Sequence, residues 1–229
     1  MADDFRVNMA GKCPKYNTAK WSTNQTKQGL DEGNYEKYTF GYNLSNQKIN
    51  QSRAFYENDK LIKEEFDFDL DDVADLTNTW EYDEKGQKTS YKCDYDGDGK
   101  TDYLERYAYD ERGNLTRFGA DKDMDGKPDT VNYMEYDEND NLTSIGVDLD
   151  GDGMYDSRSK MEYDEKGNRI TKLNDNNNDG LYEESYHYKY DDSNNMIAQE
   201  YLHYFSNGYV TGFDATYNED GELLAKTMK

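Results

Sequence analysis

An acidic nine-residue motif, D-x-D-x-D-G-x-x-D, recurs along this chain and constrains its fold more than any other feature. Four copies follow one another at intervals of 27 residues, at 94–102, 121–129, 148–156 and 175–183. A weaker copy in the same register, at 67–75, has Asp72 where the others have glycine. A fixed period of this length is typical of repeat proteins, in which each unit packs on its neighbours.

The motif predicts a cation site, because carboxylates held this close together repel one another unless a cation lies between them. Calcium takes about six to eight oxygen ligands, and positions 1, 3 and 5 of such a loop turn their carboxylates toward one centre. Glycine at position 6 permits the bend, position 7 offers its backbone carbonyl, and the acid at position 9 closes the shell directly or through water. Oxygen ligands select calcium or magnesium over zinc or copper, and the flexible loop favours calcium.

These positions define the candidate ligands. In the four strong copies they are Asp94, Asp96, Asp98, Lys100 and Asp102; Asp121, Asp123, Asp125, Lys127 and Asp129; Asp148, Asp150, Asp152, Met154 and Asp156; and Asp175, Asn177, Asp179, Leu181 and Glu183. The non-acidic residues at position 7 would contribute backbone carbonyls. In the weaker copy the candidates are Asp67, Asp69, Asp71 and Asp75, and the missing glycine leaves both binding and non-binding open. We therefore expect about four calcium sites, with a fifth left open.

The spacing resembles the nine-residue loops that join two antiparallel strands in integrin-type propeller repeats, and thrombospondin type 3 repeats use similar aspartate spacing. Helix–loop–helix EF-hands are not expected, because they need a carboxylate at position 12 and only Glu105 supplies one. Solvated loops without a cation are the simpler reading of a single copy, but four copies in register favour metal binding.

Composition points the same way. The net charge of −23 argues against nucleic-acid and anionic-membrane partners, which need basic surfaces. Five filled sites would add about 10 positive charges. Only 34% of the 229 residues are hydrophobic, and tyrosine (23 residues) outnumbers phenylalanine (8 residues). Without metal, such a chain lies near the compositional border of disorder.

No segment of the sequence has the pattern of a transmembrane span or of a signal peptide. Weak, multiple calcium sites suit a compartment with millimolar calcium, so we expect a secreted, periplasmic or surface location. Cys13 and Cys93 could pair in such a compartment, and two inert thiols remain the alternative.

A second repeated feature is a turn with the pattern Y-D-E-x-G. Its tyrosine stands at Tyr82, Tyr109, Tyr136, Tyr163, Tyr190 and Tyr217. Glycine, asparagine or aspartate four residues after the tyrosine suits a left-handed residue that closes a short hairpin. The run from Tyr109 to Thr116 resembles the YD-repeat signature of RHS-type proteins, and the resemblance covers about residues 55–229. It implies a β-repeat scaffold on a secreted or surface protein and brings no catalytic residue.

The two features together predict an all-β fold of tandem 27-residue antiparallel hairpins in an extended, twisted or curled meander sheet. All acidic loops should lie on one edge and all tight turns on the other. Residues two before each repeat tyrosine, such as Tyr107 and Met134, should share its face. Residues 1–40 are interpreted as an irregular cap and 41–229 as the repeat domain, whose last units are degenerate. Whether the sheet closes is left open.

The sequence favours a calcium-binding, calcium-stabilised β-repeat scaffold or binding module, whose partner would be a protein or a glycan. The alternative is a periplasmic immunity or inhibitor protein that binds a basic toxin or enzyme, since strong acidity would attract a basic partner. A calcium buffer is a third interpretation. An enzyme is not expected: the two histidines, His187 and His203, lie in tyrosine-rich strands, and the sequence has no nucleophile motif or phosphate loop.

Overall fold

The computed structural model describes residues 26–31, 33–42, 47–205, 207–208 and 210–229. Every secondary-structure element among these residues is a β-strand. Two compact units are present. The first contains the described residues up to Asn78 together with 95–98, the second contains residues 79–94 and the described residues from Gly99 onward, and the boundary falls inside β5 (Leu76–Tyr82). No helix among the described residues is long and apolar enough to cross a membrane.

The first unit begins with an antiparallel meander of β1 (Thr26–Asp31), β2 (Asn34–Tyr42), β3 (Lys48–Glu57) and β4 (Lys60–Asp67). Between β3 and β4, Asn58 and Asp59 have φ angles of +48° and +60°, as a two-residue type I′ turn requires. Strands β1 and β2 lie largely within the segment interpreted as an irregular cap, so strand pairing begins earlier in the chain than the sequence indicated. Residues 1–25 of that segment, with Cys13, lie outside the described part.

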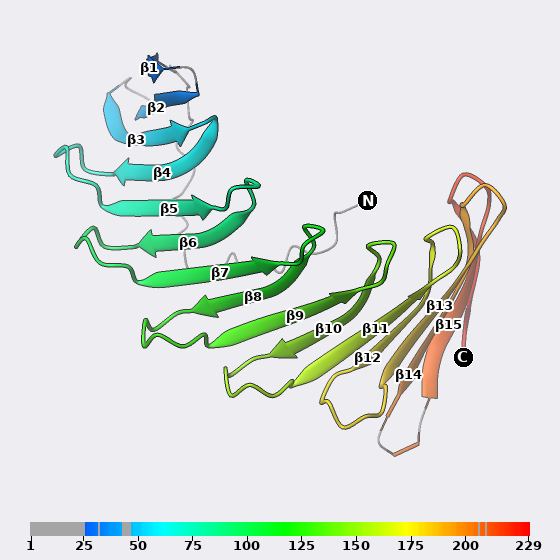
Figure 1. Cartoon of the computed structure of the whole chain (residues 1–229). Helices are drawn as coiled ribbons and strands as arrows, with labels where there is room; N and C mark the ends of the chain where they lie inside the picture. Colours follow the sequence, from blue (N-terminus) through cyan, green and yellow to red (C-terminus); the bar gives the residue numbers. More distant parts are fainter. Residues whose placement is uncertain (1–25, 32, 43–46, 206, 209) are drawn as a thin grey trace. The chain divides into compact units, whose positions relative to one another are not determined.

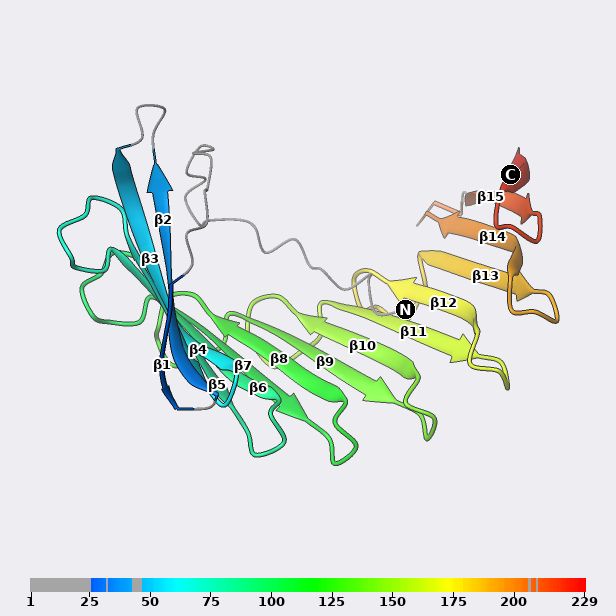
Figure 2. The same ribbon diagram turned by 90° about the horizontal axis from the view of Figure 1, so that it is seen from above.

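The second unit is an antiparallel meander whose strands lie side by side in chain order, from β6 to β16 (Figures 1 and 2). After β6 (Lys88–Asp94) come β7 (Tyr103–Tyr109), β8 (Leu115–Asp121), β9 (Thr130–Tyr136), β10 (Leu142–Asp148), β11 (Ser157–Tyr163), β12 (Arg169–Asp175), β13 (Glu184–Tyr190), β14 (Met196–Tyr204), β15 (Val210–Tyr217) and β16 (Leu223–Met228). No pair among these described strands joins one end of the meander to the other, so it is open. The predicted all-β hairpin meander is confirmed.

The acidic loops of the second unit lie along one edge of its sheet, and the tight turns lie along the opposite edge (Figure 1). We call the loops 121–129, 148–156 and 175–183 the loop edge, and the turns 109–114, 136–141, 163–168 and 190–195 the turn edge. At the turn edge the residue four after each tyrosine has a positive φ, as the sequence predicts: +99° at Gly113, +63° at Asp140 and +67° at Asn194. Asp110 N–H donates to the Asn114 carbonyl (2.9 Å), and Gly113 N–H donates to the Asp110 carbonyl (3.1 Å), which closes the turn.

A β-bulge, which the sequence pattern does not predict, follows each of these turns. Tyr109 pairs with Leu115 and Ala108 pairs with Arg117, so Thr116 has no partner in the register. The same slip occurs in the later hairpins, at residues 143, 170, 197 and 224. The extra residue is accommodated locally, since the Thr116 hydroxyl donates to the Ala108 carbonyl at 3.2 Å.

The repeat tyrosines join consecutive hairpins. The hydroxyl of Tyr136 donates to the Leu115 carbonyl (3.0 Å), and Tyr109, Tyr163 and Tyr190 donate to equivalent carbonyls at 2.9–3.0 Å. Burial raises the pKa of Tyr136, so the phenol stays a donor. The same face carries aromatic contacts, for example between Tyr107 and Phe118, whose ring centroids lie 5.2 Å apart. Tyrosine thus supplies both packing and a polar tie, as a thin sheet requires.

Candidate metal sites

Each position-1 aspartate is the last residue of a strand. Asp67 ends β4, Asp121 ends β8, Asp148 ends β10 and Asp175 ends β12. Only 6%, 6%, 1% and 4% of their respective surfaces are exposed. A carboxylate this deeply buried is rare unless it is paired, hydrogen-bonded or bound to a cation.

The loop backbone wraps around the position-1 carboxylate. In loop 148–156, Asp148 accepts hydrogen bonds from the N–H groups of Gly151 (2.7 Å) and Gly153 (2.9 Å), at positions 4 and 6. In loop 121–129, Asp121 accepts the equivalent bonds from Met124 (2.7 Å) and Gly126 (3.1 Å). These bonds hold the carboxylate in place, and a carboxylate has about four lone-pair positions, so acceptor capacity remains for a cation.

Two positions in each loop have left-handed backbone, whereas the sequence motif predicts a bend only at position 6. Position 6 has φ of +92° at Gly126 and +89° at Gly153. Position 4 is also left-handed, with φ of +59° at Met124 and +54° at Asn178. In the weaker loop, Asp72 takes φ of +66° at the position that is glycine elsewhere. That loop therefore adopts the same turn despite the missing glycine.

Position 9 closes each loop at its base. Asp129 N–H donates to the Ala120 carbonyl at 2.8 Å, and the Asp129 carboxylate accepts the N–H of Lys122 at 2.6 Å. Asp156 and Glu183 accept the N–H of position 2 in the same way, at 2.6 and 2.7 Å. The acid at position 9 is thereby held beside the acid at position 1.

The predicted acids converge in each loop. Four groups each have three carboxylates whose oxygen atoms lie within 4.8 Å of one another: Asp67, Asp69 and Asp71; Asp121, Asp123 and Asp129; Asp148, Asp150 and Asp156; Asp175, Asp179 and Glu183. In loop 94–102 the second unit contains Asp94 and Asp102, whose carboxylate oxygens lie within the same distance. The clusters could hold metal ions, and their side-chain donors are all carboxylates, without cysteine or histidine. This donor chemistry fits calcium or magnesium rather than zinc or copper.

The acid at position 5 bonds to the backbone of position 7 and joins the carboxylate cluster in only some of the loops. Asp125 accepts the N–H of Lys127 at 2.8 Å, and Asp152 accepts that of Met154 at 2.7 Å. Neither Asp125 nor Asp152 belongs to a convergent triplet, whereas Asp71 and Asp179, at the same position of their loops, do. Asn177 accepts the N–H of Asp179 at 3.1 Å. The carbonyls of Lys100, Lys127, Met154 and Leu181, like the carboxylate of Asp98, remain predicted ligands.

The weaker loop has a polar neighbour that the sequence did not reveal. The side-chain amide of Gln51 donates to Asp67 at 2.6 Å and to Asp72 at 3.2 Å. Burial raises the pKa of Asp67, but hydrogen bonds from Gln51 and from the N–H groups of Leu70 and Asp72 outweigh it and hold the pKa below its ordinary value. Asp75, the predicted closing ligand, accepts the N–H of Phe68 at 2.6 Å. No sequence signal marks Gln51, which comes from the preceding strand.

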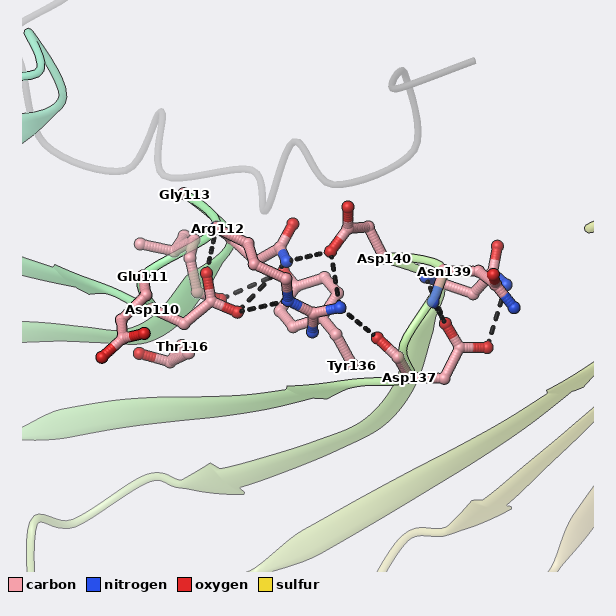
Figure 3. A network of polar contacts seen from close by, with 12 residues as sticks. Asp110, Glu111, Arg112, Gly113, Thr116, Tyr136, Asp137, Asn139 and Asp140 are labelled. Carbon is pink, nitrogen blue, oxygen red and sulfur yellow. Dashed lines mark hydrogen bonds and ion pairs between the residues drawn. The ribbon is translucent and has the colours of Figure 1, made fainter.

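The aspartates of the turn edge form a different network (Figure 3). Asn114 donates its backbone N–H and its side-chain amide to Asp110, at 2.8 and 3.1 Å. The same amide reaches Asp140 of the next turn at 2.7 Å, and the Arg112 guanidinium lies 3.0 Å from Asp140. Amides and a guanidinium thus satisfy these carboxylates, and the turn edge has no triplet of converging acids among the described residues.

No protein-family model matches the chain, and no curated protein matches its sequence. Among solved structures, TcdB2-TccC3-TEV is similar at 12% identity and a TM-score of 0.28, over 84% of this chain and 13% of that one. A porin-like protein from Bacteroides uniformis ATCC 8492 is similar at 14% identity and a TM-score of 0.38, over 90% and 95%. At these scores neither likeness bears on ligand or activity.

Proposed function

We propose that this protein is a calcium-binding β-repeat module, stabilised by calcium, that serves as a scaffold or as a binding module for a protein or glycan. The observation that supports it is the convergence of three carboxylates, within 4.8 Å of one another, in four loops of the same design. One member of each cluster is a buried aspartate at a strand end. We also propose that the protein is not an enzyme and that it is secreted, periplasmic or located at the cell surface.

Calcium acts here through folding. In an empty loop the carboxylates repel one another, and this repulsion favours an open loop. A bound cation reverses that term, and the free energy of binding is then part of the free energy of folding. Magnesium demands near-octahedral geometry and gives up water reluctantly, whereas calcium tolerates irregular oxygen shells. Sites of this kind in extracellular modules bind with dissociation constants of about 0.1–1 mM, which suits a compartment rich in calcium.

Thermal and denaturant unfolding with calcium, with magnesium and with a chelator tests the proposal. A site filled at ten times its dissociation constant adds about 1.4 kcal/mol to the free energy of unfolding, so five would add about 7 kcal/mol. The variant Asp121→Asn, Asp148→Asn, Asp175→Asn should lose about 4 kcal/mol of that gain. Its matched control, Glu138→Gln, Glu165→Gln, Asp192→Asn, removes the same charge from exposed positions and should keep the gain. Equal unfolding curves with calcium and with chelator would contradict the proposal.

A further inference from the structure

Two neighbouring loops of the second unit approach each other so closely that only glycine fits between them. A Cβ atom at Gly151 would lie 2.0 Å from the carbonyl oxygen of Pro128 and 3.6 Å from the Cα of Asp129. The first unit repeats this approach 54 residues earlier, where a Cβ at Gly97 would lie 2.3 Å from the carbonyl oxygen of Ala74. The backbone of one acidic loop therefore rests on the backbone of the loop before it.

The contact involves alternate loops. Gly97 and Gly151 occupy position 4, where the loop after each of them has Met124 and Asn178, respectively, and where the weaker loop has Leu70. All five residues are left-handed, so the loop shape does not change along the chain. A residue with a Cβ cannot bring that atom within 2.0 Å of a carbonyl oxygen, so loops 121–129 and 175–183 cannot dock through their own position 4 on the loop that precedes each of them. Loops 121–129 and 148–156 are thus a docked pair, and loop 175–183 is not docked on loop 148–156 in this way.

The contact links ligand residues of the two loops. Pro128 directly precedes Asp129, the closing acid of its cluster, and its ring faces Gly119 of the sheet, where a Cβ would lie 3.4 Å from the proline Cβ. On the other side, the Gly151 N–H donates to the Asp148 carboxylate at 2.7 Å. A short path of packed and hydrogen-bonded groups therefore runs from the closing acid of one cluster to the buried acid of the next.

We propose that cation binding in loops 121–129 and 148–156 is positively coupled through the Pro128–Gly151 contact, whereas loop 175–183 fills independently. The inference rests on the proposed function. A cation that orders Asp129 fixes Pro128, and Pro128 holds Gly151 in the conformation that presents its N–H to Asp148. By linkage, each loop raises the cation affinity of the other by the same factor.

Repulsion between the two cations acts against this coupling but does not obscure it. Loops on consecutive hairpins are separated by two strand spacings, or about 10 Å, which is near the Debye length at physiological salt. Loop 148–156 has a hairpin neighbour on each side, so the repulsion is similar for both. If disabling loop 121–129 and disabling loop 175–183 change the cation affinity of loop 148–156 by different amounts, the difference is due to the Pro128–Gly151 contact rather than to repulsion.

The test is a calcium titration of the full chain labelled with 15N-glycine. The amides of Gly126, Gly153 and Gly180 occupy position 6 and each donate to the buried aspartate of one loop, so each reports that loop separately. The variant Asp123→Asn, Asp129→Asn disables loop 121–129. It should raise the calcium concentration at the midpoint of the Gly153 amide shift roughly five-fold, which is the lower end of typical coupling. The midpoint of Gly180 should stay unchanged. As the matched control, Asp179→Asn with Glu183→Gln disables loop 175–183 and should leave the midpoint of the Gly153 amide shift unchanged.

A second variant tests the contact itself. Gly151→Asn places a Cβ against Pro128 but keeps a residue type that loop 175–183 already has at this position, in Asn178. It should remove the effect of Asp123→Asn and Asp129→Asn on Gly153. If the two disabled loops shift Gly153 equally, or if neither shifts it, coupling through the contact is overturned while calcium binding stands. If calcium moves none of the three glycine amides in the unaltered protein, the proposed function fails as well.

Discussion

At the turn edge of the second unit, Asp110 and Asp137 each accept hydrogen bonds from an asparagine four residues on, whereas at the loop edge Asp121 and Asp148 meet further carboxylates. Both edges bind backbone N–H groups through aspartate. They differ in the groups that lie beside the carboxylate oxygen atoms. At the turn edge these groups are a side-chain amide and a guanidinium, and at the loop edge they are other carboxylates.

This difference shows how one residue type closes turns in one place and forms candidate metal sites in another. A carboxylate with neutral or cationic partners is complete without a metal, so the turns close in any ionic medium. Three carboxylates that share one centre have uncompensated charge, so their loops should respond to divalent cations. The contrast predicts that stability at the loop edge depends on calcium and stability at the turn edge does not.

The largest effect is expected from Asp148→Ala. The substitution removes a carboxylate residue of which only 1% is exposed, leaves the N–H groups of Gly151 and Gly153 without their acceptor, and removes a proposed metal ligand. Two lost hydrogen bonds to a charged acceptor, at about 1.5–3 kcal/mol each, predict a loss of about 4 kcal/mol. Urea unfolding should show a larger loss with calcium than with chelator. The exposed neighbour Asp150→Ala is the control, and an equal loss from both variants would contradict the central role of Asp148.

A smaller effect, independent of calcium, is expected from Tyr136→Phe. This change removes the hydroxyl that donates to the Leu115 carbonyl at 3.0 Å and keeps the ring. One lost hydrogen bond predicts a decrease of about 1 kcal/mol in the free energy of unfolding. The same decrease should appear with calcium and with chelator. A decrease that vanishes in chelator would show that the two edges are not independent.

The acid dependence of the turn edge should be weaker still. Hydrogen bonds from the side chain and the backbone N–H of Asn141 hold the pKa of Asp137 below its ordinary value. A lowered folded-state pKa contributes stability above the unfolded pKa of about 4, and this contribution is lost as the pH falls through the lowered value. Asp137→Asn should therefore flatten the pH dependence of unfolding below about pH 4 in chelator. An unchanged slope would show that Asp137 does not contribute.

The smallest effect is expected from Arg112→Gln. Arg112 lies 3.0 Å from Asp140 and 3.6 Å from Asp110, and its side chain is 41% exposed. Exposed ion pairs contribute about 0.2–1 kcal/mol and are screened by salt. The loss should therefore shrink as salt is raised, at any calcium concentration. A loss that persists at high salt would assign it to the hydrogen bond from Arg112 to the Asp137 carbonyl, at 2.7 Å.

The repeat period made most of the fold predictable. Left-handed residues such as Gly113, the alternation of loops and turns, and the convergence of Asp121 with Asp129 follow from local sequence. Features that depend on a second segment were not predictable. Gln51 reaches Asp67 only because β3 pairs with β4, and the bulge at Thr116 appears only in the register of β7 with β8.

Position 4 of the loops lies between these cases. Its left-handed backbone could have been suspected from Gly97, Gly151 and Asn178, because glycine and asparagine favour that region. Met124 and Leu70 at the same position concealed the pattern. The closeness of Gly151 to Pro128 depends on how two loops stack, and local propensity does not report that.

The chain-order pairing of the second unit has a kinetic consequence. Each strand from β6 to β16 bonds only to strands next to it in the sequence, and the tyrosine ties bridge only 21 residues. Closing such short loops takes little entropy, and proteins rich in local contacts fold fast for their class. Any hairpin can serve as the nucleus, and growth can proceed from it in both directions. The folding rate of this sheet should therefore depend on how fast one hairpin forms rather than on the length of the whole chain.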